Sequence, residues 1–179
     1  YSFAEGISTT ATGEASHAEG SNTTSLGDYS HAEGNGSKSI GNNSHAEGTR
    51  TIANNNQSHA EGYETKSLAN GAHSEGDSTI AYGKYSHTEG ANSVVGYDSI
   101  KPTTNNLEVP SNTGDDNGGY AHAEGSATLA IGKASHAEGN KTFASSNYSH
   151  AEGLGTITKN EAEHAEGKYN VSNTGTISS

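Results

Sequence analysis

The chain has 179 residues, of which only 28% are hydrophobic, and its 21 acidic and 9 basic side chains give a formal net charge of −12 at pH 7. So polar a composition is typical of disordered chains and excludes an ordinary globular core. The absence of cysteine excludes disulfides and thiolate metal sites. The negative charge and the scattered basic residues argue against nucleic acid as a partner, and no apolar run approaches the roughly 20 residues that a membrane span needs.

A tandem repeat explains how such a chain can fold. The tripeptide Ala-Glu-Gly, or a near match to it, recurs every 14 residues along the sequence. The one exception is the 35-residue step from Gly90 to Gly125, which equals one unit plus 21 inserted residues. We therefore predict β-roll repeats over residues 1–96 and 121–179 and an inserted surface loop over residues 97–120. Because Tyr1 already lies inside a repeat, we expect the chain to be part of a longer protein.

Each unit divides into two halves, which we expect to be two short strands. The first half reads Ser-His-Ala-Glu-Gly, as at residues 30–34, and the second reads Thr/Ser-x-Ala-x-Gly, as at residues 79–83. Small residues alternate with larger ones in both halves, which is the period of a strand with two distinct faces. The predicted fold is all-β, a solenoid of 14-residue coils with a five-residue strand in each half and the small residues, glycine included, pointing inward. About eleven coils at the strand spacing of ~4.8 Å would make a rod on the order of 50 Å long.

These motifs resemble a known family. The alternation Ser-x-Ala-x-Gly in paired halves is similar to the YadA-like head repeat of trimeric autotransporter adhesins, and the Ser-His-Ala-Glu-Gly version resembles repeats in tail-fibre and appendage proteins of phages and prophages. The resemblance implies a left-handed parallel β-roll, a homotrimer, and a structural and adhesive role in a fibre outside the cell, on a cell surface or a virion tail. It also implies a host-cell surface, or an extracellular glycan or protein receptor, as the partner. Adhesin heads usually carry Val and Ile where this chain has His and Glu.

Histidine and glutamate form the most regular feature of the repeat. All ten histidines occupy one position of the unit, Phe3 fills it once, and Glu follows two residues later in every copy. Residues at i and i+2 of a strand point to the same side, so stacked coils would align a His column beside a Glu column. A threefold contact that is repeated in every coil favours identical residues at each level. The His/Glu face of the first half of the unit meets this condition, whereas the outward residues of the second half vary. The predicted trimer interface consists of His17, Glu19, His31, Glu33, His45, Glu47, His59, Glu61, His73, Glu75, His87, Glu89, His122, Glu124, His136, Glu138, His150, Glu152, His164 and Glu166.

We expect no catalytic residue, cofactor or metal in this segment. A repeated His/Glu pair without a singular Ser, Cys or Asp partner is typical of a scaffold rather than of an active site. The alternative for metal is an octahedral site on the trimer axis, with His31, Glu33, His45 and Glu47 as axial ligands.

The insert is predicted to be the most function-specific part of the chain. It contains both prolines, and long loops on rigid scaffolds are where binding concentrates. A tolerated insertion that only braces the trimer is the alternative. The candidate contact residues are Asp98, Lys101, Leu107, Glu108, Asp115 and Asp116.

Two other functions compete with a fibre segment. A glycan-degrading enzyme built on a trimeric rod would need its carboxylates in the insert or outside this sequence. An ice-binding solenoid would need outward-facing hydroxyl arrays, whereas the Thr and Ser positions are predicted to face inward.

The His/Glu pairing also carries an expectation about pH. If the carboxylates stabilise imidazolium, the folded His pKa values rise and the rod gains stability as the pH falls from about 7 toward 5.

Overall fold

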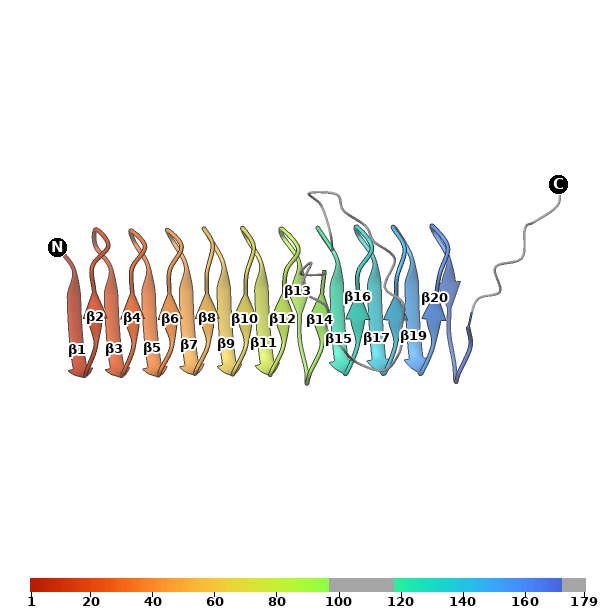
Figure 1. Cartoon of the computed structure of the whole chain (residues 1–179), viewed down its shortest axis with the longest axis horizontal. Helices are drawn as coiled ribbons and strands as arrows, with labels where there is room; N and C mark the ends of the chain where they lie inside the picture. Colours follow the sequence, from red (N-terminus) through yellow and green to blue (C-terminus); the bar gives the residue numbers. More distant parts are fainter. Residues whose placement is uncertain (97–117, 172–179) are drawn as a thin grey trace.

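The computed structural model describes residues 1–96 and 118–171. The chain winds into coils that stack along one axis, from β1 at the N-terminal end to β21 (Figure 1). Within these residues the chain forms strands and turns, and no helix is present that could cross a bilayer. The predicted all-β solenoid is confirmed.

The strands form two parallel sheets, because each coil contributes one strand to each sheet. The first sheet contains eleven strands: β1 (Phe3–Ile7), β3 (His17–Ser21), β5 (His31–Asn35), β7 (His45–Thr49), β9 (His59–Tyr63), β11 (His73–Asp77), β13 (His87–Thr88), β15 (His122–Ser126), β17 (His136–Asn140), β19 (His150–Leu154) and β21 (His164–Ala165). The second sheet contains ten: β2 (Thr10–Ala11), β4 (Thr24–Ser25), β6 (Lys38–Ser39), β8 (Ile52–Ala53), β10 (Lys66–Ser67), β12 (Ile80–Ala81), β14 (Val94–Val95), β16 (Leu129–Ala130), β18 (Phe143–Ala144) and β20 (Ile157–Thr158).

The register pairs each residue with its equivalent in the next coil. His31 pairs with His45, and Glu33 pairs with Glu47. The register survives the insert, since His87 pairs with His122. Outside the strands the backbone stays bonded from coil to coil, as where the Leu26 amide donates to the Ser39 carbonyl at 2.8 Å. Rung-to-rung bonding thus satisfies most of the backbone of a very polar chain.

The second strand of each coil is shorter than predicted. It has two residues, as in β4, and not five, because the chain turns soon afterwards. At this turn Tyr29 adopts a left-handed conformation with φ 57°. The first strand has the predicted five residues in most coils but begins at His rather than at Ser.

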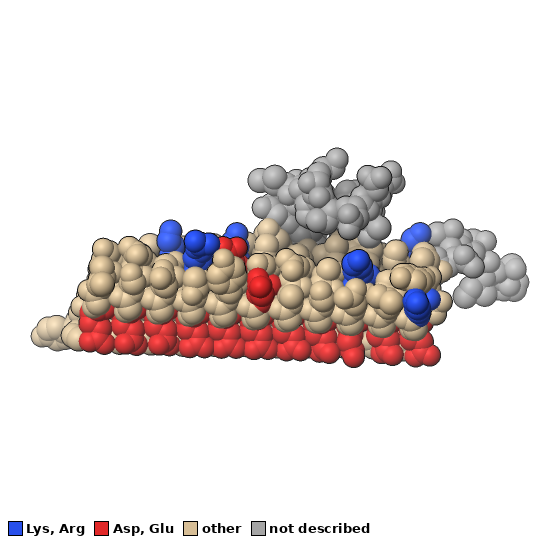
Figure 2. All heavy atoms as spheres, turned by 90° about the horizontal axis from the view of Figure 1, so that it is seen from below, with Lys and Arg blue, Asp and Glu red and all other residues tan. Residues whose placement is uncertain are grey.

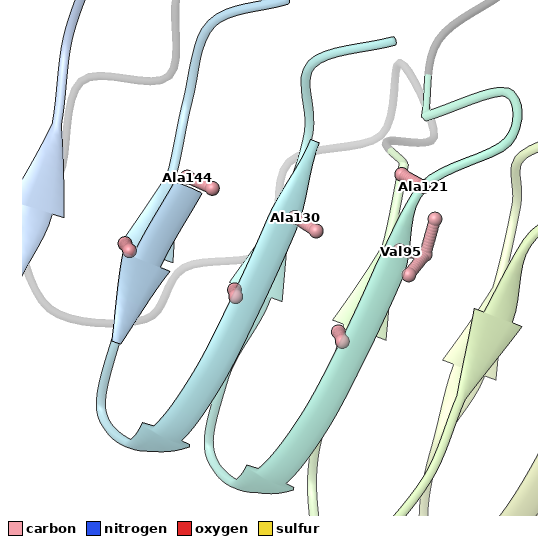
Figure 3. Close-up of a cluster of buried hydrophobic side chains, with 7 residues drawn as sticks. Val95, Ala121, Ala130 and Ala144 are labelled. Carbon is pink, nitrogen blue, oxygen red and sulfur yellow. The ribbon is translucent and has the colours of Figure 1, made fainter. Parts of the chain in front are cut away.

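The interior is narrow and filled by small side chains. Ala18, Ala32 and Ala46 are fully buried, and so are the hydroxyl residues Thr23 and Thr51. Figure 3 shows how Val95, Ala121, Ala130 and Ala144 lie between the two sheets, where they belong to one cluster of buried apolar side chains. Among the described residues the largest fully buried side chains are one Ile, one Val and a series of Thr.

The glycine of Ala-Glu-Gly lies outside this interior, contrary to the prediction. Gly34 is exposed and has φ +99°, a conformation that disfavours every residue with a Cβ atom. A Cβ atom placed on Gly34 would lie 2.1 Å from the carbonyl oxygen of Gly48 in the next coil. This glycine is therefore required because neighbouring coils approach closely, and not because the interior is narrow.

The insert leaves the coil at one corner and re-enters it at the same corner. A Cβ atom on Gly118 would lie 2.4 Å from the Cα atom of Gly96, so the two residues adjoin. The Tyr120 amide donates to the Lys84 carbonyl at 2.9 Å, as equivalent residues do in other coils. Residues 118–120, which were predicted as part of the insert, thus complete a coil. The candidate contact residues Asp98, Lys101, Leu107, Glu108, Asp115 and Asp116 lie outside the described residues, as do residues 172–179 of the predicted repeats.

Candidate functional site

The ten histidines form one continuous stack of rings on the outer face of the first sheet. Successive ring centroids from His17 to His164 lie 4.6–4.9 Å apart, and the ring planes differ by 2–15°. Phe3 continues the stack at 5.4 Å with a tilted ring. This stacking follows from the register, since each His begins its strand and pairs with the His of the next coil.

The glutamates form a second row beside the histidines, which Figure 2 shows as a red stripe along the edge of the rod. Their closest contacts run between coils: Glu19 Oε1 lies 3.3 Å from His31 Nε2, and Glu33 Oε1 lies 3.3 Å from His45 Nε2. Contacts within a strand range from 3.5 Å, for His150 Nε2 and Glu152 Oε2, to 3.9 Å, for His45 Nε2 and Glu47 Oε2. The structure thus brings the predicted His and Glu residues together on one face, which we call the ladder.

The ladder is half-buried in the single chain. Its histidine side chains are about one-third exposed, with values from 33% to 36% among the ion-paired ones. Several of the Nε2 atoms are nevertheless shielded from solvent and have no hydrogen-bond partner within the described structure. They belong to His17, His59, His73, His87, His122, His136 and His150.

The pKa values of four histidines move in the direction opposite to the expectation. Burial in the stack lowers the pKa of His59 and His73, and neighbouring imidazoles lower it further. The same causes, in the same order, lower the pKa of His122 and His150. The carboxylates act in the opposite direction but do not prevail, because stacking removes water from both faces of each ring. The expectation of raised His pKa values is therefore wrong for these four residues.

The glutamates share protons along their row. Hydrogen bonds with Glu47 and Glu75, in which the protonated Glu61 is the donor, raise the pKa of Glu61 to about 7, with burial as a further cause. The same hydrogen bonds lower the pKa of Glu47 and of Glu75, and a hydrogen bond with Glu75 raises the pKa of Glu89. Carboxylates one coil apart repel one another, so a proton held on Glu61, between Glu47 and Glu75, stabilises this part of the row.

A groove of about 610 Å³ runs beside the glutamate row. It is lined by Glu33, Gly34, Glu47, Gly48, Glu61, Gly62, Glu75, Gly76, Glu89 and Gly90. The missing glycine side chains leave this space open next to the carboxylates. The glycine after each Glu is the sequence signal for this groove. The prediction that this glycine points into the interior obscures the signal.

The second sheet presents a less regular outer face. Equivalent positions hold Thr24, Lys38, Ile52 and Lys66, so neither charge nor shape repeats from coil to coil. Most of the basic residues that Figure 2 shows lie away from the glutamate stripe. The Thr column at Thr23 and Thr51 is buried, which disfavours an outward hydroxyl array for ice binding.

The predicted axial metal ligands lie close together within one chain. Ligand atoms of His31, Glu33 and His45 are all within 4.8 Å of one another. The rings of His31 and His45 are parallel to within 6°, however, so their in-plane lone pairs cannot point at a common ion between them. An ion on this face would use one imidazole together with carboxylates.

Two segments of the N-terminal coils match a known family. Residues 4–30 and 32–54 match the YadA head domain repeat. These coils are similar to that repeat. The coil of 14 residues and its register continue beyond the matched segments to β21, so the same parallel coil extends along the described rod. Comparison with the curated proteins gives no match.

Proposed function

We propose that this chain is a structural and adhesive segment of a homotrimeric fibre that lies outside the cell, on a bacterial surface or a virion tail. The observation that carries the proposal is the uniformity of the ladder, where Glu recurs in every coil and His in every coil after the first, while the outer face of the second sheet varies. The similarity to the YadA head repeat supports a fibre of the adhesin type. A host-cell surface, or an extracellular glycan or protein, is the proposed partner.

The ladder is the proposed contact between the three chains. A threefold axis parallel to the rod brings the same face of each chain together at every coil. The ladder repeats identically at each level, its side chains are partly exposed, and many of its Nε2 atoms have no hydrogen-bond partner among the described residues. A proton on Glu61, whose pKa is raised to about 7, lowers the negative charge that three such rows would bring together.

We also propose that the segment has no catalytic activity of its own. The titratable residues of the ladder recur as identical pairs in successive coils, whereas an active site combines different groups at one place. A glycan-degrading activity would contradict this proposal. It would appear as release of reducing ends from bacterial surface polysaccharide by the purified chain.

The oligomeric state tests the main proposal. Sedimentation equilibrium should give three times the 18.2 kDa chain mass. A fully folded monomer at micromolar concentration would refute the trimer.

Cysteine crosslinking locates the interface, since the chain contains no cysteine of its own. The variant His73→Cys places a thiol on the ladder, and Ile52→Cys is the matched control on the second sheet. Oxidation should link chains through position 73, because residues near a threefold axis approach within the roughly 4.4–6.8 Å Cα separation of a disulfide. Crosslinking through position 52 alone would put the interface on the opposite face.

A further inference from the structure

Two histidines of the ladder hold their Nε2 atoms between two carboxylates. His45 Nε2 lies 3.3 Å from Glu33 Oε1 and 3.9 Å from Glu47 Oε2. His87 Nε2 lies 3.4 Å from Glu75 Oε1 and 3.9 Å from Glu89 Oε2. Both sites combine one imidazole nitrogen with a carboxylate two residues farther along the same coil and one from the preceding coil.

These distances are close to those of a shared metal ion. Zinc binds imidazole nitrogen at about 2.0–2.1 Å and carboxylate oxygen at about 2.0–2.2 Å, so two ligand atoms of a tetrahedral ion lie roughly 3.4 Å apart. One pair in each site already has this separation, and the other needs to close by about half an ångström. Side chains on a partly exposed face can rotate by that much.

A second observation concerns a histidine nitrogen that has no hydrogen-bond partner. His87 Nε2 is shielded from solvent and has no hydrogen-bond partner in the described structure, although buried polar atoms normally have one. The groove of about 610 Å³ adjoins all four carboxylates and has room for water molecules that complete the coordination of an ion.

We propose that the ladder binds divalent ions of the zinc class, each held by one imidazole and by the two carboxylates that flank it, with His45 and His87 as the clearest sites. Two carboxylates balance the charge of one such ion. Adjacent coils share a carboxylate, so ions occupy at most every second coil. The ligands of each site belong to one chain, and the site therefore does not depend on the proposed trimer.

The experiment uses the whole chain after removal of metal with EDTA. Calorimetric titration with Zn²⁺ measures the number of ions bound, and Co²⁺ reports nitrogen and oxygen ligation through its visible absorption. We expect tight Zn²⁺ binding that a hundredfold excess of Mg²⁺ does not displace, because Mg²⁺ prefers oxygen ligands and retains its water. Equal displacement by Mg²⁺ would reduce the effect to diffuse attraction of cations and overturn the proposal.

Substitutions test the named ligands. The double variant His45→Gln/His87→Gln should bind fewer Zn²⁺ ions than the unsubstituted chain, and Glu33→Gln/Glu47→Gln should lose the ion at His45. Glu161→Gln is the control, since it removes one carboxylate charge from an exposed corner away from the ladder. Unchanged Zn²⁺ stoichiometry and affinity in both double variants, with normal circular dichroism, would overturn the proposal.

Sedimentation of the same samples keeps this outcome separate from the proposed function. Zn²⁺ binding by a monomer would refute the trimer and leave the metal site intact. A trimer that does not bind Zn²⁺ would refute the metal site and leave the trimer proposal intact.

Discussion

At the scale of the residue, glycine and the titratable groups carry the most specific consequences. Gly34 shows this best, because its exposed position suggests tolerance while its surroundings forbid a side chain. Both its φ of +99° and the nearby Gly48 carbonyl oppose a Cβ atom.

Gly34→Ala should therefore destabilise the rod strongly. We expect a loss of about 3 kcal/mol or more in the free energy of unfolding, since left-handed strain and a backbone clash add together. Gly36→Ala is the matched control: Gly36 has φ +73°, but its nearest neighbour would lie 3.7 Å from the new Cβ atom. This control should lose only about 1–2 kcal/mol, from strain alone. Equal losses in urea unfolding would mean that coil contact does not select the glycine.

Glu61→Gln should stabilise the rod in a pH-dependent manner. The folded pKa of about 7 lies above the ordinary 4.5, so the folded chain holds a proton that the unfolded chain has released. That contribution to stability is complete below pH 4.5 and is lost as the pH rises through 7. In metal-free buffer the variant should melt higher than the unsubstituted chain at pH 8 and about equally at pH 4. Glu161→Gln serves as the control, and a difference in melting temperature that stays constant with pH would contradict the shared proton.

The four histidines with lowered pKa values should change the stability of the rod with pH in the direction opposite to Glu61. Because the folded pKa values of His59, His73, His122 and His150 lie below 6.5, the unfolded chain takes up these protons first. Their contribution to stability is complete above pH 6.5 and is lost as the pH falls toward the folded pKa values. NMR titration of the metal-free chain should place these four imidazoles below the free-peptide value. Values above it would restore the original expectation that carboxylates govern the ladder.

At the scale of the element, the buried threonines of the interior differ in whether their hydroxyl groups are hydrogen-bonded. Thr79 donates its hydroxyl to the Glu75 carbonyl at 3.1 Å. Thr51 is equally buried, but its hydroxyl has no hydrogen-bond partner in the described structure. The same residue type at equivalent positions therefore makes different contributions to stability.

Valine substitutions should separate the two situations. Thr51→Val removes an unsatisfied buried hydroxyl and should be neutral or stabilising by about 1 kcal/mol. Thr79→Val removes a hydrogen bond and leaves its acceptor, so it should cost about 1 kcal/mol. Thermal unfolding of the two variants provides the measurement. Equal effects would show that the hydroxyls of the column do not differ.

The sequence predicts these elements well where one residue type repeats. The 14-residue period predicts the coil, the parallel register and the outward His/Glu face, because each depends only on alternation and spacing. The length of the second strand depends on where the corner at Tyr29 turns, and residues of many types occupy that corner. The pKa values of the histidines could not be predicted in the same way, since they reflect burial between stacked rings and not the nearest carboxylate in the sequence.

At the scale of the whole molecule, the rod is modular. Each coil bonds to the coils before and after it, so a change within one corner leaves the remaining coils in register. The corner between Gly96 and Gly118 illustrates this, because the two residues adjoin across the insert.

Deletion of residues 97–117, which joins Gly96 to Gly118, should leave the rod folded. We expect the circular dichroism spectrum to remain that of a β-solenoid and the melting temperature to change by only a few degrees. Binding of the fibre segment to a panel of bacterial and host cells should fall if the insert makes the contact. Unchanged cell binding by the deletion variant would contradict the contact role of the insert.

The matched register of the coils also has a genetic consequence. Any coil can follow any other, since Ala pairs with Ala and Glu with Glu at every junction from β15 to β19. Unequal recombination between the repeated codons of the gene would add or remove whole coils without creating a mismatched junction. The reach of the fibre can then evolve in steps of about 4.8 Å per repeat, while the ladder stays continuous.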